Sequence, residues 1–406
     1  MGDKSAFVGG MKLKISELGK VITGNTPSKK IKEFWDKDDV GFVKPDIISD
    51  EHIVKIKSED CNEFISNAAI SKARIVPKNS IFVTCIGNIG KIGVATENLA
   101  FNQQINAIIP NENVNLDYLC YAIFANKTRL QDIANAPIVP LLNKSQFSEF
   151  ELEFDMDINT QTRIVHELNT VSNIILKYKQ ELLLLDELVR ARFMEMFGDP
   201  VLNEKLWRVI KLGELCSKIC SGNTPKGGSD NYTKEGIMFF RSQNVWKNRL
   251  ELDDIVYIDE ATHEKMKETS LNYGDILITK TGRINTENSS LGRSALFLGK
   301  NDSANINGHV YLVRINSELV NRHFVLQILI SPQYRDLIRR VCVGGIDKRQ
   351  LNQNHIYDFP IIIPPLELQN QFASFVEEID KSRSRIQKSL EASQELFDSL
   401  MQEYFG

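Results

Sequence analysis

The chain of 406 residues has no long apolar run: none approaches the roughly 18 residues that a membrane-spanning helix needs. It also has no charged-then-apolar leader at its start. We therefore expect a soluble, cytoplasmic protein. The length and the 42% hydrophobic content predict two or three domains, each able to bury its own core.

Cysteine is sparse, with six residues and no paired CxxC sets, so a zinc site is not expected. Thiols spread this thinly are typical of reduced core residues. Cys216 and Cys220 could share a helix face, but a lone pair of this kind is usually structural. The sequence predicts no metal and no cofactor.

Catalytic motifs are missing as well. No histidine stands in an HExxH arrangement, and Pro45-Asp46 is not followed by the (Asp/Glu)-x-Lys of a metal-dependent nuclease. The glycines of 87–93 lack phosphate-loop spacing, and FPIIIPP at 359–365 lacks the Asn of the methyltransferase motif NPP[FY]. The net charge of -4 also argues against gripping DNA by bulk electrostatics, so any nucleic-acid role needs local basic patches or charge from a partner.

What the chain does contain is a long heptad pattern between about 159 and 198, where apolar residues alternate in steps of four and three. A second such pattern follows 208 residues later, interrupted by Arg383 and Ser393. A long, narrowly striped helix needs a partner helix, so the two are predicted to form one intramolecular antiparallel coiled coil. Its predicted seam consists of Ile164, Leu168, Val171, Ile175, Leu182, Leu185, Val189, Phe372, Val376, Ile379, Ile386, Leu390, Phe397 and Leu400.

The blocks before the two patterns also repeat one another. LGKVITGNTP at 18–27 is answered by LGELCSKICSGNTP at 212–225, and NSIFVTCIG at 79–87 by GDILITKTG at 274–282. Short strand signals dominate each block, including KPDII at 44–48, with helical pattern near the end of the first block at 116–134. The polypeptide is thus a tandem duplication of a globular block followed by a long helix.

We therefore predict an α+β fold in which two α/β domains, in pseudo-twofold tandem repeat, are separated by a long antiparallel two-helix coiled coil. The expected boundaries are a disordered start at 1–11, a first domain at 12–158, a central helix at 159–198, a second domain at 199–365 and a distal helix at 366–406.

This arrangement resembles the specificity subunit of Type I restriction-modification systems. The resemblance rests on SGNTP or GNTP opening each block, IPPLELQNQ leading into the last helix, and MFGDP at 196–200 ending the central one. The first helix departs from the pattern, since only Gln161 and Arg163 match Gln369 and Gln371. The resemblance implies two target-recognition domains and no catalytic activity. It also implies three kinds of partner: double-stranded DNA with a bipartite site, two methyltransferase subunits, and outer restriction subunits.

Each block carries polar turns with side chains suited to reading DNA. Arg and Lys match the paired acceptors of guanine, and Asn and Gln match the edge of adenine. Any single member is more often a solvated loop residue, but the groups as wholes favour DNA contact. The candidates are Lys44, Asn88, Lys91, Asn102, Gln103 and Gln104 in the first block, and Arg241, Gln243, Asn244, Lys280, Arg283, Arg293, Asn307 and His309 in the second. Lys144, Lys348 and Arg349 are candidate phosphate contacts.

Three alternatives stay open at this point. The GNTP turns could cradle a phosphate, although a structural role is favoured. Leu183 and Leu184 point away from the predicted seam and could form a docking face for a second protein. The chain could instead be a catalytic restriction or methylation enzyme, or a coiled-coil interaction scaffold with no DNA role.

Overall fold

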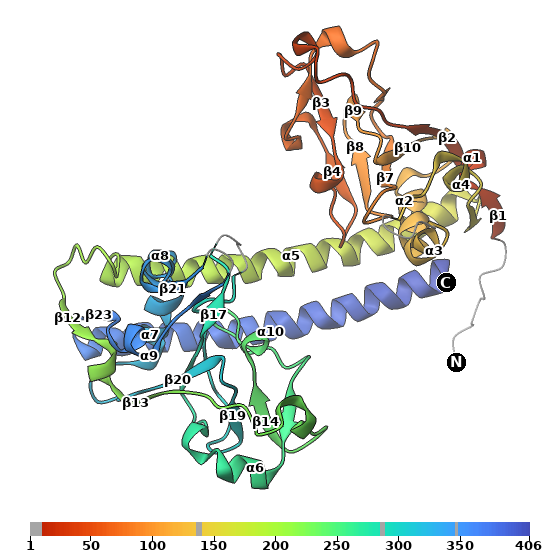
Figure 1. Ribbon diagram of the computed structural model, residues 1–406. Helices are drawn as coiled ribbons and strands as arrows, with labels where there is room; N and C mark the ends of the chain where they lie inside the picture. The colour runs from red at the N-terminus through yellow and green to blue at the C-terminus, as the bar shows by residue number, and fades with distance from the viewer. Residues whose placement is uncertain (1–9, 135–139, 285–288, 346–347) are drawn as a thin grey trace. The chain divides into compact units, whose positions relative to one another are not determined.

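The computed structural model describes residues 10–134, 140–284, 289–345 and 348–406 (Figure 1). The chain divides into two compact units. The N-terminal unit comprises Met1–Lys179 with Lys388–Gly406, and the C-terminal unit comprises Gln180–Gln387. Residues 1–9 of the expected disordered start lie outside the described residues, and strand β1 begins at Met11.

The N-terminal unit contains a five-stranded sheet of order β2-β10-β7-β8-β4 and a four-stranded sheet of order β5-β3-β9-β6, with β1 paired to β11. Its strands are β1 Met11–Lys14, β2 Gly19–Thr23, β3 Val40–Val43, β4 Val54–Ile56, β5 Phe64–Ile65, β6 Ile75–Val76, β7 Ile81–Thr84, β8 Ile92–Ala95, β9 Leu99–Phe101, β10 Ile105–Pro110 and β11 Glu151–Phe154. Its short helices are α1 Ile15–Leu18, η1 Lys32–Phe34, η2 Pro45–Ile47, η3 Ser58–Asp60, η4 Asn67–Ala69, α2 Leu116–Ala125, α3 Lys127–Asp132 and α4 Lys144–Ser148.

The C-terminal unit repeats this plan with sheets of order β13-β20-β16-β18 and β15-β14-β19, and with β12 paired to β23. Its strands are β12 Arg208–Lys211, β13 Cys216–Ser221, β14 Ile237–Phe240, β15 Val256–Ile258, β16 Ile276–Thr279, β17 Thr281–Gly282, β18 Ser294–Leu296, β19 Ala304–Ile306, β20 Val310–Ile315, β21 Val343–Gly344, β22 Arg349–Gln350 and β23 Pro360–Ile363. Its short helices are η5 Leu212–Leu215, η6 Gly228–Asn231, η7 Ser242–Asn244, α6 Glu260–Lys265, η8 Lys267–Thr269, α7 Arg322–Ile330, α8 Pro332–Val341 and α9 Gln353–Tyr357.

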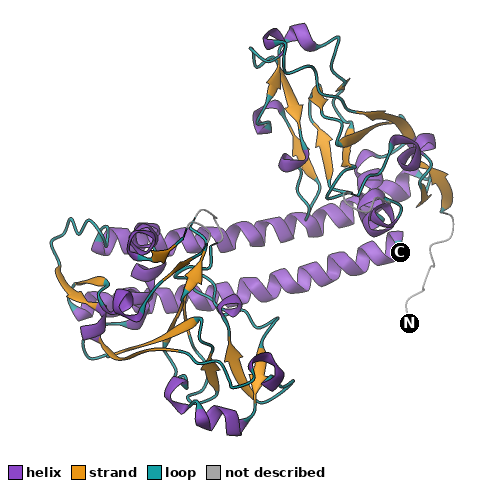
Figure 2. Ribbon diagram, in the orientation of Figure 1, coloured by secondary structure: helices purple, strands orange, loops and turns teal. Residues whose placement is uncertain are grey.

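The sheet orders confirm the predicted duplication, because β2, β10, β7 and β8 correspond in sequence and neighbours to β13, β20, β16 and β18. The second sheets correspond through β5-β3-β9 and β15-β14-β19, where the β3–β9 and β14–β19 pairs are both parallel. Figure 2 shows the mixture of helix and strand in each unit. The predicted α+β class with two repeated domains is therefore confirmed.

Two helices of 40 residues each, α5 (Ile158–Phe197) and α10 (Leu366–Phe405), follow the two blocks. Each contributes to both units, and within each unit they run antiparallel. In the N-terminal unit Tyr404 Oη donates a hydrogen bond to Glu167 Oε2 over 2.5 Å, whereas in the C-terminal unit the rings of Phe193 and Phe372 lie 5.5 Å apart. All fourteen predicted seam residues are buried or half-buried. The predicted coiled coil is therefore confirmed as the architecture of these helices.

The interruption of the second heptad pattern at Arg383 has a structural explanation. Its guanidinium lies 2.7 Å from Asp186 on the facing helix and 3.5 Å from Asp380 on its own helix. An ion pair therefore replaces an apolar contact at this step, and it lies at the antiparallel register set by the surrounding apolar residues.

A repeated glutamine fixes the start of each long helix to its block. The side chains of Gln161 and Gln369 are both fully buried. Gln161 Oε1 accepts from the Asn115 N–H at 2.8 Å, and Gln369 Oε1 accepts from the Asn321 N–H at 2.9 Å, where each Asn is the N-cap of α2 or α7. The matching glutamines therefore have the same structural role in both units. Each buried side-chain amide accepts a hydrogen bond from a backbone N–H at a helix N-terminus that has no partner within the helix.

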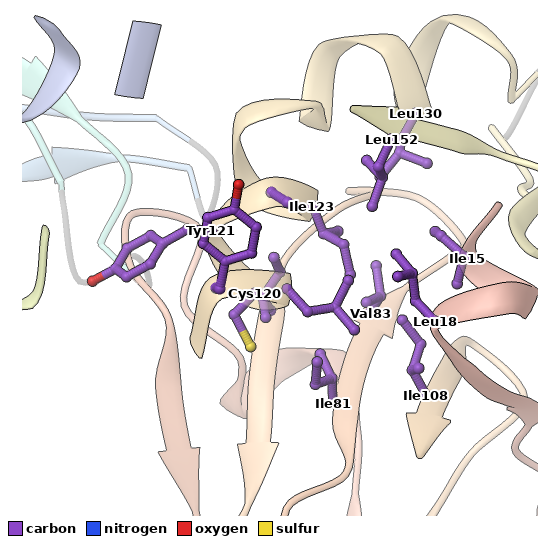
Figure 3. Packing of buried hydrophobic residues seen from close by; sticks show 14 of the residues in the cluster. Ile15, Leu18, Ile81, Val83, Ile108, Cys120, Tyr121, Ile123, Leu130 and Leu152 are labelled. Atoms are coloured by element: carbon purple, nitrogen blue, oxygen red, sulfur yellow. The ribbon is translucent and has the colours of Figure 1, made fainter. Parts of the chain in front are cut away.

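The core of the N-terminal unit lies between the five-stranded sheet and helix α2. Figure 3 shows Ile81, Val83 and Ile108 of the sheet beneath the helix that carries Cys120 and Ile123. The strand residues alternate faces, so the other face of the same sheet supplies a second core that contains Phe82 and Phe101. The large buried apolar area of these layers provides the main stabilisation of the unit.

Two local expectations were wrong. KPDII at 44–48 is not a strand, since Pro45–Ile47 forms the 3-10 turn η2 with Pro at its first position. Cys216 and Cys220 do not share a helix face but lie on strand β13, where a register shift between Cys216 and Lys218 directs the two thiols to different hydrophobic cores. Among the described residues no helix has the length and apolar character required to cross a membrane.

Candidate nucleic-acid interface

In each unit two turns pack against each other, and we call the pair a doubled turn. One is the GNTP segment, at 24–27 or 222–225, and the other is the polar segment, at 102–104 or 307–309, that leads into β10 or β20. A Cβ at Gly24 would lie 2.1 Å from the Asn102 carbonyl oxygen, and one at Gly222 would lie 2.2 Å from that of Asn307. Only glycine fits so close to another backbone. The contact gives the GNTP turns a structural role, as support for the segments that carry the candidate reading residues.

The polar segments at 102–104 and 307–309 each contain both a buried and an exposed side chain. Asn102 and Asn307 are buried, and their Oδ1 atoms accept from the backbone N–H groups of Gln104 and His309 at 3.1 and 3.0 Å. Gln103 and His309 are exposed. The two asparagines therefore shape the turns, while the exposed neighbours present polar edges to solvent.

Lys44 and Arg241 occupy the same place in the two units, as N-cap residues of the 3-10 turns η2 and η7. Lys44 pairs with Glu63, and this contact lowers the pKa of that carboxyl. Arg241 lies 2.9 Å from Asp254, whose pKa is lowered by hydrogen bonds first from Gln243 and then from the guanidinium. Both cations are thus held in a fixed orientation by an acidic neighbour.

Gln243 and Asn244, which follow Arg241, differ in exposure and in their hydrogen bonds. Gln243 Nε2 donates to Asp254 Oδ2 at 2.8 Å, and Gln243 is exposed. Asn244 is buried: its Oδ1 accepts from the Arg241 N–H at 3.0 Å, and its Nδ2 donates to the Glu251 carbonyl at 3.1 Å. Burial and these internal bonds leave the amide of Asn244 no free edge for a base in this conformation.

The loop after the central strand carries a second group in each unit. Asn88 is exposed, and Lys91 Nζ donates to the Pro45 carbonyl at 3.4 Å. Lys280 Nζ lies 5.3 Å from the ring centroid of Tyr311, and Arg283 is exposed. The first group follows β7, which pairs with β10, and the second follows β16, which pairs with β20. Strands β10 and β20 are the ones that the polar segments with Asn102 and Asn307 lead into.

The remaining candidates lie on segments that adjoin these loops: Arg349 pairs with Gly282 through strands β22 and β17, and the Arg293 carbonyl accepts from the Thr279 N–H at 2.9 Å. Arg293 is buried immediately before β18, with Nε donating to the Ser289 carbonyl at 3.1 Å and the guanidinium 3.8 Å from the ring centroid of Trp246. Lys144 is exposed at the first position of α4, and Lys348 is exposed before β22. Arg349 donates to the Cys342 carbonyl at 3.5 Å.

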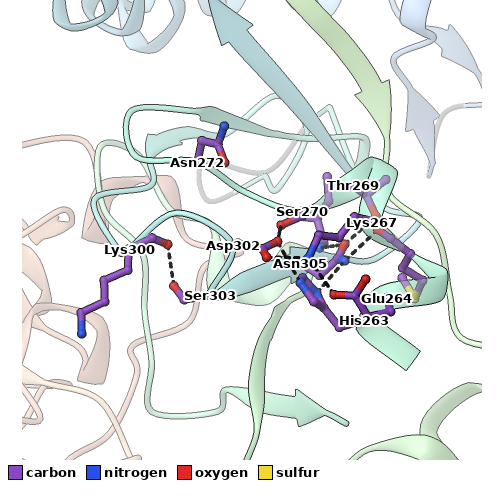
Figure 4. Close-up of polar contacts among 12 residues, drawn as sticks. His263, Glu264, Lys267, Thr269, Ser270, Asn272, Lys300, Asp302, Ser303 and Asn305 are labelled. Atoms are coloured by element: carbon purple, nitrogen blue, oxygen red, sulfur yellow. Dashed lines mark hydrogen bonds and ion pairs between the residues drawn. The ribbon is translucent and has the colours of Figure 1, made fainter. Parts of the chain in front are cut away.

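Among the described residues one group of side chains has metal-ligand chemistry, namely His263, Glu264 and Asp302, and no sequence motif indicates it because Asp302 is distant in the chain. Figure 4 shows that Lys267 points into this group. Its Nζ donates to Glu264 Oε1 at 2.7 Å and to Asp302 Oδ2 at 2.5 Å. An ammonium therefore already neutralises the carboxylates that a cation would need, and His263 completes a structural hydrogen-bond network with Asp302 and Asn305.

Comparison with known proteins is consistent across sequence and structure. A family profile described as "Type I restriction modification DNA specificity domain" matches residues 9–184 and 204–394. The MjaIX specificity subunit of Methanocaldococcus jannaschii, a Type I restriction enzyme component, is 26% identical over 96% of this chain and 90% of its own length. The HindI specificity subunit of Haemophilus influenzae is 34% identical over 34% of this chain and 30% of its own length.

Among solved structures, the Type I restriction-modification S subunit of M. genitalium superposes with a TM-score of 0.61 at 15% identity, covering 100% of this chain and 98% of that one. A chain from a study of complex assembly in the Type I system has a TM-score of 0.51 at 15% identity, with full coverage of both chains. These two likenesses concern the fold. Because the family profile covers both repeated halves, the chain belongs to the Type I restriction-modification DNA specificity family.

Proposed function

We propose that this chain is the non-catalytic DNA sequence-specificity subunit of a Type I restriction-modification complex. The observation that carries the proposal is the match of the specificity-domain family to both repeats. The duplicated turns, built on the same glycine contact but bearing different outward side chains, support it further. A protein that reads two unlike half-sites needs this combination of a shared frame and divergent contacts.

Each unit then reads one half of a bipartite site. The exposed or half-buried members of the candidate set are the ones best placed to reach base edges. Arg241 and Lys44 are expected to contact guanine after leaving their acidic partners, and Gln103 and Gln243 are expected to contact adenine. Asn102, Asn244 and Asn307 are expected to hold the reading turns in shape through their internal hydrogen bonds.

The partners are double-stranded DNA and methyltransferase subunits, two of the latter in our proposal, with restriction subunits joining outside them. Support for two copies comes from Leu188 of α5 and Leu396 of α10, which are equivalent by the 208-residue repeat and are 47% and 51% exposed, one in each unit. Leu183 and Leu184 extend the apolar surface beside Leu188 and are 65% and 52% exposed. Action on host DNA places the complex in the cytoplasm.

The docking proposal predicts that Leu188→Lys and Leu396→Lys each remove one methyltransferase subunit, because a charge replaces an apolar contact in either case. The mass of the assembled complex should fall by one subunit for each single variant and by two for the double variant. Leu202→Lys is a matched control, since Leu202 is 70% exposed but lies beyond the end of α5. Unchanged mass in both single variants would contradict docking at these leucines.

The proposed function is tested by mapping methylated positions in host DNA with and without this gene. A split motif should disappear when the gene is removed and return when it is restored. The purified chain alone should neither methylate nor cleave DNA and should bind the mapped duplex weakly until methyltransferase subunits are added. Turnover of S-adenosylmethionine by the chain alone would instead favour the catalytic alternative.

A further inference from the structure

The C-terminal unit contains a pocket of about 460 Å³ where its globular block meets its part of the helix pair. The pocket is lined from α5, α7, α8 and α10 and from the segment that follows η7. Five basic and three acidic side chains line it: Arg190, Lys247, Arg335, Arg339 and Arg383, against Asp186, Asp336 and Asp380.

The three acids are already engaged by two of the five bases. Arg383 contacts Asp186 and Asp380, and Arg339 contacts Asp336 at 3.0 Å. The pKa of Asp380 is raised, chiefly by burial, and the charge of Arg383 opposes this shift.

Three basic side chains that line the pocket therefore have no carboxylate of the lining as a partner. Within the described residues Arg190, Lys247 and Arg335 form no ion pair with an acid. Arg335 is 7% exposed, and its NH1 donates to the Leu291 carbonyl at 2.5 Å. The Nε of Arg339 is also buried without a hydrogen-bond partner.

The electrostatics of the pocket reflect this excess. Burial and then the positive charges of Arg339 and Arg293 lower the pKa of Arg335 to about 10. The pKa of Lys247 is lowered by burial and then by four neighbouring arginines. Cations that disfavour one another in this way are stabilised when an anion enters between them.

The N-terminal unit has a counterpart pocket of about 360 Å³, whose charged lining is balanced, with the carboxylates of Glu51 and Asp117 against the ammonium groups of Lys55 and Lys179. The third residue after the 3-10 turn is Lys247 in the C-terminal unit but Asp50 here, and Asp50 forms an ion pair with Lys127. The neighbouring Glu51 pairs with Lys179 of α5 at 2.6 Å. The position equivalent to Arg190 is Asp398, by the 208-residue repeat. The excess of basic over acidic side chains is thus specific to the pocket of the C-terminal unit.

We propose that the C-terminal pocket binds one backbone phosphate of the DNA that this unit reads, with Lys247 and Arg190 as its principal contacts. The proposal rests on the proposed function and adds a site to it. Two identical methyltransferase subunits would present the same acidic groups to both units, so a pocket that has a basic excess in one unit only fits the partner that differs between them, the DNA. The segment also favours nucleic acid, because Arg241 to Lys247 runs continuously from a candidate base contact to the pocket.

The flank of the pocket supports the same ligand. Trp246, next to Lys247, has the Arg293 guanidinium 3.8 Å and that of Arg249 5.4 Å from its ring centroid. Stacking on the indole stiffens both guanidinium groups and keeps positive charge beside the pocket. Arg249 is additionally paired with Glu251, so Lys247 and Arg190 remain the available phosphate ligands.

The test uses the complete complex with methyltransferase subunits on the mapped duplex. Lys247→Met and Arg190→Ala, combined, should weaken binding in low salt and flatten its salt dependence. One lost phosphate contact lowers the slope of log K against log salt by about 0.9, so between 50 and 200 mM salt the variant should lose about 3-fold less affinity than the parent. Arg192→Ala is the matched control on α5, because Arg192 is paired with Glu195 at 2.7 Å. Its slope should equal that of the parent.

A second measurement places the phosphate. A scan of single uncharged methylphosphonates should reveal one position, near the half-site of the C-terminal unit, that weakens the parent complex but not the double variant. Lys247→Arg should restore sensitivity there, which separates a charge effect from misfolding. An unchanged slope together with impaired methyltransferase assembly would overturn the proposal in favour of a protein carboxylate. If the C-terminal half-site itself is not read, the proposed function fails instead, and the methylation map detects that separately.

Discussion

The two units share a backbone plan and differ in how they use charge. Both have the same order of four strands in the main sheet, the same glycine contact and the same buried glutamine. At the junction with the helices, however, the N-terminal unit pairs Asp50 with Lys127, whereas the C-terminal unit leaves Lys247 among arginines. The repeated halves therefore share the groups that satisfy the backbone and differ in the groups that face outward, which is the pattern expected when two halves read different DNA.

The largest effect should come from breaking the shared frame. Gly222→Ala places a Cβ 2.2 Å from the Asn307 carbonyl oxygen, a backbone atom that cannot move aside cheaply. We expect a loss of about 3 kcal/mol in the free energy of unfolding of the C-terminal unit, together with loss of methylation at its half-site. Gly24→Ala should do the same to the other half. Urea unfolding and methylation mapping measure both effects.

Gly308→Ala is the control, because its Cβ would meet nothing closer than Thr224 Oγ1 at 3.5 Å. It lies in the same doubled turn and should leave stability within about 0.5 kcal/mol of the parent. Equal destabilisation by Gly222→Ala and Gly308→Ala would show that the turn tolerates no side chain for reasons other than the close backbone contact.

The next prediction changes the distance between the units without changing either one. The boundary between the units crosses α5 after Lys179 and α10 after Gln387, which are equivalent positions in the 208-residue repeat. Inserting four residues at both points lengthens the pair by about 6 Å and adds about 40° beyond a full turn. We expect the same half-sites with a spacer longer by one or two base pairs in the methylation map.

Insertion of two residues at the same points is the matched control. It rotates the apolar stripe by about 200°, so the seam cannot re-form and folding should suffer. A four-residue variant that is fully active on the original spacer would show that the helices do not measure the DNA.

The sequence predicted the frame well, because its signals are local and periodic. The heptad spacing predicted the helix pair. The matching Gln161 and Gln369 marked two positions whose buried side chains hydrogen-bond the N-termini of α2 and α7. The role of each polar turn residue was harder to predict. Asn102 and Gln103 are adjacent and chemically alike, yet one is buried as a turn support and the other is exposed, and only the folded backbone distinguishes them.

The basic pocket could not be predicted from the sequence for a related reason. Arg190, Lys247 and Arg335 come from three elements separated by long stretches of chain, and the net charge of -4 gives no hint that they gather. Even the ion pairs that distinguish the two junctions depend on tertiary contacts between a loop and a helix, as with Glu51 and Lys179.

A moderate effect should separate the two reading functions. Arg241→Ala should relax reading of the half-site of the C-terminal unit by about 1 to 3 kcal/mol if the guanidinium makes a bidentate contact with guanine. Lys44→Ala should affect the other half-site only. Arg241→Lys keeps the charge but loses the fork geometry, and should recover little of the discrimination. Competition binding with duplexes altered in one half-site at a time measures each effect, and equal weakening on all sequences would identify phosphate contacts instead.

The smallest predicted effect concerns Asp302, whose pKa is held well below its ordinary value of 3.8 by hydrogen bonds from Lys267 and then Ser270. The corresponding residue of the N-terminal unit, Glu97, instead accepts from the Ser58 backbone N–H. Since the folded chain binds the Asp302 proton less readily than the unfolded chain, its contribution to stability is present above about pH 5 and decreases as the pH falls through 4. Asp302 is 47% exposed, so solvent screening keeps the contribution at about 1 kcal/mol or less.

Asp302→Asn is a suitable variant, because asparagine tolerates the backbone φ of 64° at this position. Its stability deficit relative to the parent, measured by urea unfolding, should narrow between pH 6 and pH 4, and added magnesium or zinc should not shift the parent's unfolding midpoint because Lys267 already neutralises the group. A deficit that stays constant with pH would mean that the hydrogen bonds of Asp302, rather than its charge, stabilise this corner of the C-terminal unit.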